Sequence, residues 1–167
     1  MTRLLSLPAL VVAGAVLLAA CGGSSSSSTT TAASSTAAAK ASSSPRPAPV
    51  VDTSKSSLGT FLVDAKGRAL YLWDADHGAM STCSGACAQA WPPLTTSGTP
   101  KAGGAAKASL LGTIKRADGT SEVTYAGHPL YYFAGDSAPK QTNGQGSNSF
   151  GSPWWVVSPA GQAIQKG

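Results

Sequence analysis

The stretch GRALYLWDAD (67–76) decides the fold, because it returns without gaps as GHPLYYFAGD (127–136). The two copies share a leading glycine, a Leu-Tyr pair, an aromatic residue two positions after the tyrosine, and a final aspartate. The shared aromatic and acidic residues are Tyr71, Trp73 and Asp76 in the first copy and Tyr131, Phe133 and Asp136 in the second. Internal similarity of this kind indicates two structural units of similar build.

The similarity extends to the sequence around both copies. The flanking matches are a valine before the glycine (Val63, Val123), a Leu-Gly-Thr triplet (58–60, 111–113) and a tryptophan downstream (Trp91, Trp154). A unit of roughly fifty to sixty residues lies within the period range of repeat proteins. We therefore predict one folded domain over residues 57–167, with repeat one at about 57–94 and repeat two at about 110–160.

Each copy predicts a β-hairpin. The β-favouring runs 60–63 and 122–125 lead through a short glycine-containing connection into the aromatic-rich runs 68–73 and 129–133. Two such runs around a short glycine turn are typical of a hairpin. Residues 154–157 (WWVV) form a further candidate strand near the C-terminus.

Both faces of the second strand in each hairpin are apolar. Side chains alternate between the two faces of a strand. One face carries Leu70, Leu72, Leu130 and Tyr132, and the other carries Tyr71, Trp73, Tyr131 and Phe133. A strand that is apolar on both faces is expected to be packed on both sides.

One short helix is expected at about residues 84–91, with Ser81 or Thr82 as its N-cap. Two prolines follow Trp91 and end the helix there, because a residue before proline disfavours helical geometry. The fold prediction is therefore mainly β: two tandem hairpin-based repeat units form one small antiparallel β domain with one short helix.

Residues 1–20 read as a signal peptide. Arg3 precedes an apolar run that is shorter than the roughly 20 residues needed to span a membrane. The run ends in Leu-Ala-Ala-Cys (18–21), which resembles the bacterial lipobox at which a signal peptidase cuts and leaves a lipidated cysteine. We predict a lipoprotein whose Cys21 carries the lipid (palmitate) anchor, so the membrane is its first partner.

Residues 21–56 are rich in Ser, Thr, Ala and Pro and contain very few aliphatic side chains that could be buried. Such a segment cannot offset its ordering entropy and is expected to act as a disordered tether. A lipid anchor and a tether together predict a domain on the extracytoplasmic face of the cell membrane.

The charge pattern argues against nucleic acid as a partner. The whole chain has a formal net charge of +5, but from residue 57 onward eight Lys/Arg face six acidic residues. The basic residues of the domain are scattered, apart from Lys115-Arg116, and form no patch of the kind that binds phosphate backbones.

The two motif copies give the chain a resemblance to a known family. It resembles the bacterial secreted-repeat lipoproteins, which carry a Tyr-x-(Phe/Trp/Tyr)-x-x-Asp motif and have no known function. The motif occurs here at 71–76 and 131–136, and the CxxxC…WPPL segment at 83–94 is similar to the family's first repeat. The resemblance implies a surface lipoprotein with no established activity, and it supplies no catalytic residues.

Two interpretations stand for the cysteines that remain after lipidation. Cys83 and Cys87 are close neighbours in an oxidising compartment, where such a pair usually forms a disulfide. The alternative is a copper site formed by His77, Met80, Cys83 and Cys87, because imidazole, thioether and thiolate suit copper. In the first interpretation there is no cofactor; in the second the protein is a copper-binding or redox accessory protein.

The aspartates offer only a fragment of a hard-metal site. Asp74 and Asp76 precede a glycine, as in the start of a calcium loop. However, Asp74 aligns with Ala134, whereas Asp76 aligns with Asp136. The shared aspartates follow an aromatic strand, where a carboxylate commonly accepts backbone N–H groups in an Asx-type turn. We therefore predict a structural role for Asp76 and Asp136.

No motif of a known catalytic class occurs in the chain. His77 and His128 occupy different repeat positions, and neither is paired with a nucleophile by spacing. The aromatic residues are expected to form the core, with a carbohydrate platform as the alternative. The sequence thus predicts a non-catalytic, lipid-anchored module that binds a cell-envelope polymer or a protein partner.

Overall fold

The structure is a computed structural model that describes residues 48–166. The predicted signal peptide, Cys21 and most of the predicted tether lie outside these residues. The elements in chain order are β1 (Val50–Ser56), β2 (Gly59–Asp64), β3 (Tyr71–Trp73), α1 (Ala86–Ala90), β4 (Thr95–Thr96), β5 (Lys101–Ala102), η1 (Ala108–Leu110), β6 (Leu111–Lys115), β7 (Ser121–Tyr125), β8 (His128–Pro129), η2 (Ser149–Gly151) and β9 (Trp154–Val156). The mainly β prediction is confirmed.

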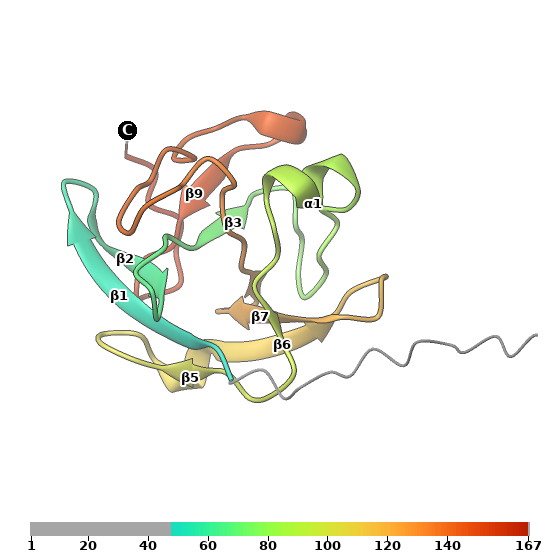
Figure 1. Ribbon diagram of the computed structural model, residues 1–167, viewed down its shortest axis with the longest axis horizontal. Helices are drawn as coiled ribbons and strands as arrows, with labels where there is room; N and C mark the ends of the chain where they lie inside the picture. Colours follow the sequence, from blue (N-terminus) through green and yellow to red (C-terminus); the bar gives the residue numbers. More distant parts are fainter. Residues whose placement is uncertain (1–47, 167) are drawn as a thin grey trace, which may run out of the picture. The chain divides into compact units, whose positions relative to one another are not determined.

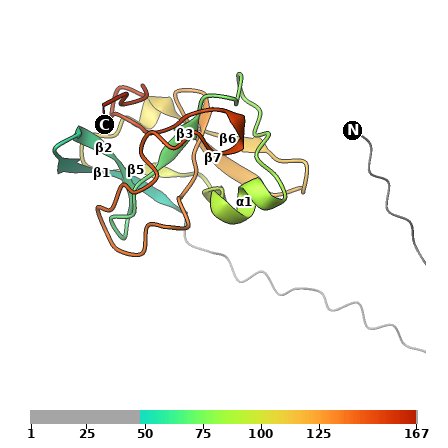
Figure 2. The same cartoon turned by 90° about the horizontal axis from the view of Figure 1, so that it is seen from above.

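The strands form three small sheets. Their orders are β2-β1-β5, β3-β9 and β4-β7-β6, with β8 paired to β7. All pairings are antiparallel except β1 with β5. In Figures 1 and 2, β3 lies centrally, with the β1–β2 hairpin on one side and α1 on the other.

The folded domain begins earlier than residue 57. Val50–Ser56 forms strand β1, which pairs with β2 from Val51 to Ser56 and buries Val51 completely. The prediction assigned this segment to the tether because it is mostly polar. Its backbone is nevertheless held by the ladder to β2, and Val51 alone joins the core.

The predicted hairpins differ by one residue in their turns. In repeat two, Ala126 and Gly127 make a two-residue turn with positive φ at both positions, the conformation that hairpins favour. In repeat one the turn takes three residues, with Gly67 N–H bonded to Asp64 O and Gly67 in the left-handed region. The extra residue shifts the register of the first hairpin.

This shift overturns two of the sequence matches. Leu62, rather than Val63, is the counterpart of Val123. The carbonyl of Leu62 accepts the hydrogen bond from the Leu70 N–H, just as the carbonyl of Val123 accepts the one from the Leu130 N–H. The Leu-Gly-Thr triplets are also not equivalent. Residues 58–60 lie at the turn into β2, whereas 111–113 lie in β6, which is the counterpart of β1.

The two repeats exchange their last strands. Leu94, at the end of repeat one, bonds to the backbone of Leu130 and Val123 in repeat two at 2.8 Å each. Val157, at the end of repeat two, bonds to Leu70 and Leu62 in repeat one. Each repeat therefore completes the other's sheet.

The repeats also meet at their centre. Tyr71 and Tyr131 face each other across an antiparallel bridge, and the two residues exchange backbone hydrogen bonds of 2.8 and 2.9 Å. The motif strands thus lie side by side, one from each copy.

The core is divided by these strands, as the alternation predicted. One cluster contains Tyr71, Trp73 and Tyr131, with Phe133 packed against it. The other contains Leu70, Leu72 and Leu130, with Tyr132 packed against it. The central strands are therefore buried on both faces, and the two-sided packing is confirmed.

The predicted helix is present but shorter. It spans Ala86–Ala90 and ends at Trp91, as the following prolines require. The predicted N-cap is wrong, because Gly85 occupies that position and no side chain caps the helix. Thr82 instead bonds to Asp76.

Candidate functional site

Asp76, the last residue of the first motif, is buried and joins the two repeats. Its Oδ2 accepts a hydrogen bond from the Tyr131 hydroxyl at 2.5 Å. Its Oδ1 accepts two hydrogen bonds from Thr82, one from the backbone N–H at 2.8 Å and one from the hydroxyl at 2.7 Å. A carboxylate that is only 4% exposed is thereby supplied with donors on both oxygens.

Asp136 makes the reciprocal arrangement. Its Oδ2 accepts a hydrogen bond from the Tyr71 hydroxyl at 2.6 Å, and its Oδ1 accepts one from the backbone N–H of Asn143 at 2.8 Å. Burial raises the pKa of the Asp136 carboxyl and, more strongly, the pKa of the Tyr71 and Tyr131 hydroxyls. The tyrosine of each motif therefore bonds to the aspartate of the other.

These contacts correct the predicted Asx-type turn. Each aspartate does accept a backbone N–H, but from Thr82 or Asn143, six or seven residues further along the chain. The carboxylates close longer loops and at the same time bind the phenols. The repeated Tyr and Asp pointed to a shared role, but their pairing across copies had no sequence signal.

Three tryptophans stack beside the motif tyrosines. The Trp73 and Trp154 ring centroids lie 5.0 Å apart with planes 6° from parallel, and those of Trp91 and Trp154 lie 3.9 Å apart at 3°. Tyr71 meets Trp91 edge-on at 5.3 Å, and Tyr131 meets Trp154 edge-on at 5.2 Å. A continuous aromatic cluster thus runs through the core.

Most aromatic side chains proposed as a carbohydrate platform therefore lie in the core. The fully buried ones are Tyr71, Trp91, Tyr131 and Trp154, and Trp73 is 8% exposed. Trp155 is half-buried, and its indole N–H donates to Asp74 at 3.0 Å. That contact gives Asp74 a surface role outside the motif pairs.

Cys83 and Cys87 form the predicted disulfide, with their Cα atoms 5.2 Å apart. This bond contradicts the copper alternative, because a sulfur in a disulfide is not a thiolate that could bind the metal. Met80 is 65% exposed, and His77 is exposed in the loop that follows β3. Residues 48–166 contain no group of three or more His, Cys, Asp or Glu side chains arranged to hold a metal ion.

A buried ion pair, Arg116–Glu122, was not found from the sequence. Glu122 is fully buried, and its Oε2 accepts from Arg116 Nη1 at 2.7 Å. Arg116 also donates to the carbonyl of Cys83 at 2.5 Å and to the Ser81 hydroxyl. Ser81 Oγ lies 2.7 Å from the Tyr131 hydroxyl, so the network reaches the motif.

The environment of Glu122 changes its acidity. Burial raises its pKa to about 7, although the hydrogen bond and charge of Arg116 act in the opposite direction. Its Oε1 has no hydrogen-bond partner within residues 48–166. The sequence carried one signal for this buried acid: Glu122 is an ionisable residue inside the β-favouring run that forms β7.

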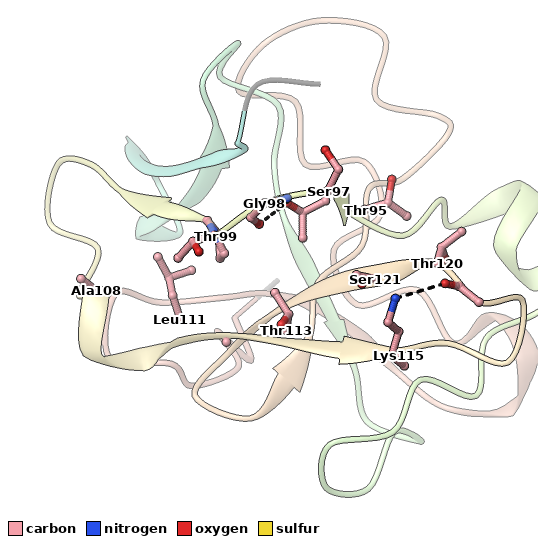
Figure 3. A pocket seen from close by; sticks show the side chains of 14 residues that line it. Thr95, Ser97, Gly98, Thr99, Ala108, Leu111, Thr113, Lys115, Thr120 and Ser121 are labelled. Carbon is pink, nitrogen blue, oxygen red and sulfur yellow. Dashed lines mark hydrogen bonds between the residues drawn. The ribbon is translucent and has the colours of Figure 1, made fainter. Parts of the chain in front are cut away.

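A surface groove of about 1150 Å³ lies between the 95–100 segment and β6. Figure 3 shows Thr99 opposite Leu111 and Thr113, with Lys115 further along the same strand. Lys115 Nζ donates to the carbonyl of Gly119 at 3.4 Å. The lining consists mainly of hydroxyl-bearing and glycine residues and contains no aromatic side chain.

Two interlocked β repeats with a local disulfide define a small extracytoplasmic β-repeat domain, since disulfides persist in oxidising compartments. The family described as a secreted repeat of unknown function matches residues 52–95 and 112–158, and the chain belongs to it. The two matched segments correspond to the two repeats of the structure. No curated protein and no solved structure matched the chain.

Membership in a secreted family places the domain outside the cytoplasm. Within residues 48–166, no helix has the length and apolar character needed to cross a membrane.

Proposed function

We propose that the protein is a lipid-anchored, non-catalytic module that binds a polar polymer of the cell envelope. The lipobox-like residues 18–21 support the anchor, and the secreted family supports the extracytoplasmic site. The tether between Cys21 and β1 would allow the domain to reach polymer some distance from the membrane.

The observation that carries the binding proposal is the groove between the 95–100 segment and β6. Its threonine and serine hydroxyls can donate and accept hydrogen bonds, and Lys115 adds a cationic donor. A lysine strengthens hydrogen bonds to carboxylate or phosphate. The groove therefore suits a hydroxylated polymer that also carries acidic groups, such as the strands of peptidoglycan.

The non-catalytic part of the proposal rests on three acids that are engaged within the fold. Asp76, Asp136 and Glu122 are engaged by Tyr131, Tyr71 and Arg116. These carboxyls hold the repeats together, and none of them lines the groove.

Co-sedimentation of the purified full chain with insoluble peptidoglycan tests the proposal. Lys115→Ala should lower the apparent affinity roughly five-fold, because a lost hydrogen bond of about 1 kcal/mol has that effect. Lys55→Ala is the matched control, since it removes another exposed lysine, which lies in β1 and outside the groove. Equal retention of the Lys115→Ala variant and the wild type would contradict groove binding.

A further inference from the structure

The binding proposal gives no role to the stacked tryptophans or to the Tyr71–Asp136 and Tyr131–Asp76 pairs. We propose that together they form a one-electron relay. A strong one-electron oxidant, such as a radical or a high-valent metal complex, removes an electron from Trp73. The electron hole left on Trp73 then passes to Trp154 and Trp91, and an electron from Tyr71 or Tyr131 fills it.

Trp73 is the most exposed member of the relay, and the steps between its members are closely spaced. Trp73 is 8% exposed, whereas Trp91, Trp154 and both tyrosines are fully buried. The tryptophan planes are within 6° of parallel at each step, which gives direct overlap of their π systems. Each tyrosine touches one tryptophan of the inner pair, Tyr71 on Trp91 and Tyr131 on Trp154.

The tyrosines are suited to end the transfer because each has a proton acceptor in place. A phenol that loses an electron alone would become a buried cation, which is costly in an apolar core. Tyr71 instead gives its electron to the Trp91 radical cation and its hydroxyl proton to Asp136 Oδ2, 2.6 Å away. The products are neutral Trp91, a neutral Tyr71 radical and a protonated Asp136.

The second tyrosine has the same chemistry available. Tyr131 gives its electron to the Trp154 radical cation and its proton to Asp76 Oδ2 at 2.5 Å. For either tyrosine, the oxidant gains one electron and one aspartate gains one proton, so charge and atoms balance.

The tryptophans have no carboxylate that could accept a proton, and they therefore pass the electron hole on. Trp91 Nε1 is buried and has no hydrogen-bond partner within residues 48–166. The indole N–H groups of Trp73 and Trp154 donate to the backbone carbonyls of Ser152 and Ser149, which are far weaker bases than a carboxylate. An oxidised indole therefore has no strong base to take its proton, and it does not become a stable neutral tryptophan radical.

The test uses the full chain in detergent, with photogenerated tris(bipyridine)ruthenium(III) as the oxidant and electron paramagnetic resonance as the readout. The wild type should give a neutral tyrosyl radical, and its formation should slow in D₂O because a proton moves with the electron. Formation of only a tryptophan radical, or the absence of a solvent isotope effect, would overturn the proposal. Both measurements use the wild type, so they do not require any variant to fold.

Variants locate the radical. In a Tyr131→Phe background, Asp136→Asn should lower the yield at Tyr71 about ten-fold or more, because each pKa unit of lost proton affinity is a factor of ten. Tyr125→Phe is the control: Tyr125 is also buried, but it donates to the Pro159 carbonyl and lies in the other core cluster. Near-ultraviolet circular dichroism checks that each variant is folded.

Two variant results count against the relay. One is an unchanged tyrosyl yield when Tyr71→Phe and Tyr131→Phe are combined. The other is a loss of the signal in Tyr125→Phe with both motif tyrosines intact. Either would place the radical outside the stack.

Discussion

At the scale of single residues, the motif aspartates have two partners each. One oxygen binds the phenol of the other repeat, and the other oxygen holds the following loop. The Tyr and Asp of one motif therefore do not bond to each other; each bonds to the Asp or Tyr of the other motif. Both carboxylates contribute to stability mainly through the donors that would be unpaired without them.

Replacing these aspartates should destabilise the fold. Asp76→Ala leaves the buried Tyr131 hydroxyl without its acceptor, which costs about 1–3 kcal/mol, and removes two hydrogen bonds from the exposed Thr82 that are worth about 0.5 kcal/mol each, so we expect a total loss of about 2–4 kcal/mol. Asp136→Ala, which is less buried, should cost about 1–3 kcal/mol. Urea unfolding measures both, and retention on peptidoglycan should be unchanged in the folded fraction.

Asp74→Ala serves as the control for this prediction. Asp74 is exposed, and its carboxylate accepts a hydrogen bond from the half-buried indole of Trp155, so its loss should cost under about 1 kcal/mol. A wild-type melting temperature in both the Asp76 and the Asp136 variants would refute the structural role.

Glu122 makes stability depend on pH. Its folded-state pKa of about 7 lies above the ordinary value of 4.5, so the folded state keeps this proton after the unfolded state has released it. The resulting stabilisation is complete below about pH 4.5, falls as the pH rises, and is lost by about pH 7; its size is roughly 3 kcal/mol.

Comparison with Glu122→Gln isolates this effect, since glutamine does not titrate. The free energy of unfolding of the wild type minus that of the variant should fall by about 2–3 kcal/mol between pH 5 and pH 8, because only the wild type loses stability over this range. A signed difference that is constant or rises over this range would show that burial does not raise the pKa of Glu122.

At the scale of elements, sequence patterns worked where the local signal was strong. The alternation of apolar residues assigned both faces of the motif strands correctly, and Pro92 placed the helix end at Trp91. The disulfide followed from the spacing of two cysteines in an oxidising compartment. Each of these features depends on residues close together in the chain.

The missed features depend on register or on distant partners. The one-residue difference between the two hairpin turns moved Leu62, not Val63, into the position matching Val123. Strand β1 is polar and is stabilised by pairing with β2. The Arg116–Glu122 pair and the Tyr–Asp exchange join residues whose proximity exists only after the repeats have docked.

At the scale of the whole molecule, the proposed lipid anchor would decide where the domain acts. Cys21→Ala should prevent lipidation and move the protein from the membrane fraction to the soluble fraction of broken cells. Incorporation of labelled palmitate measures the modification directly. Membrane retention of the unlabelled variant would contradict the proposed anchor.

The exchange of terminal strands between repeats bears on how such a chain could arise. A polypeptide with a single copy would lack the neighbour that supplies the counterpart of Leu94 or Val157, and the partner for its own Tyr and Asp. Such an ancestor would have had to assemble as a two-fold homodimer. Fusion of two copies into one chain would then make an intermolecular contact intramolecular, and each half could diverge while the other kept it folded.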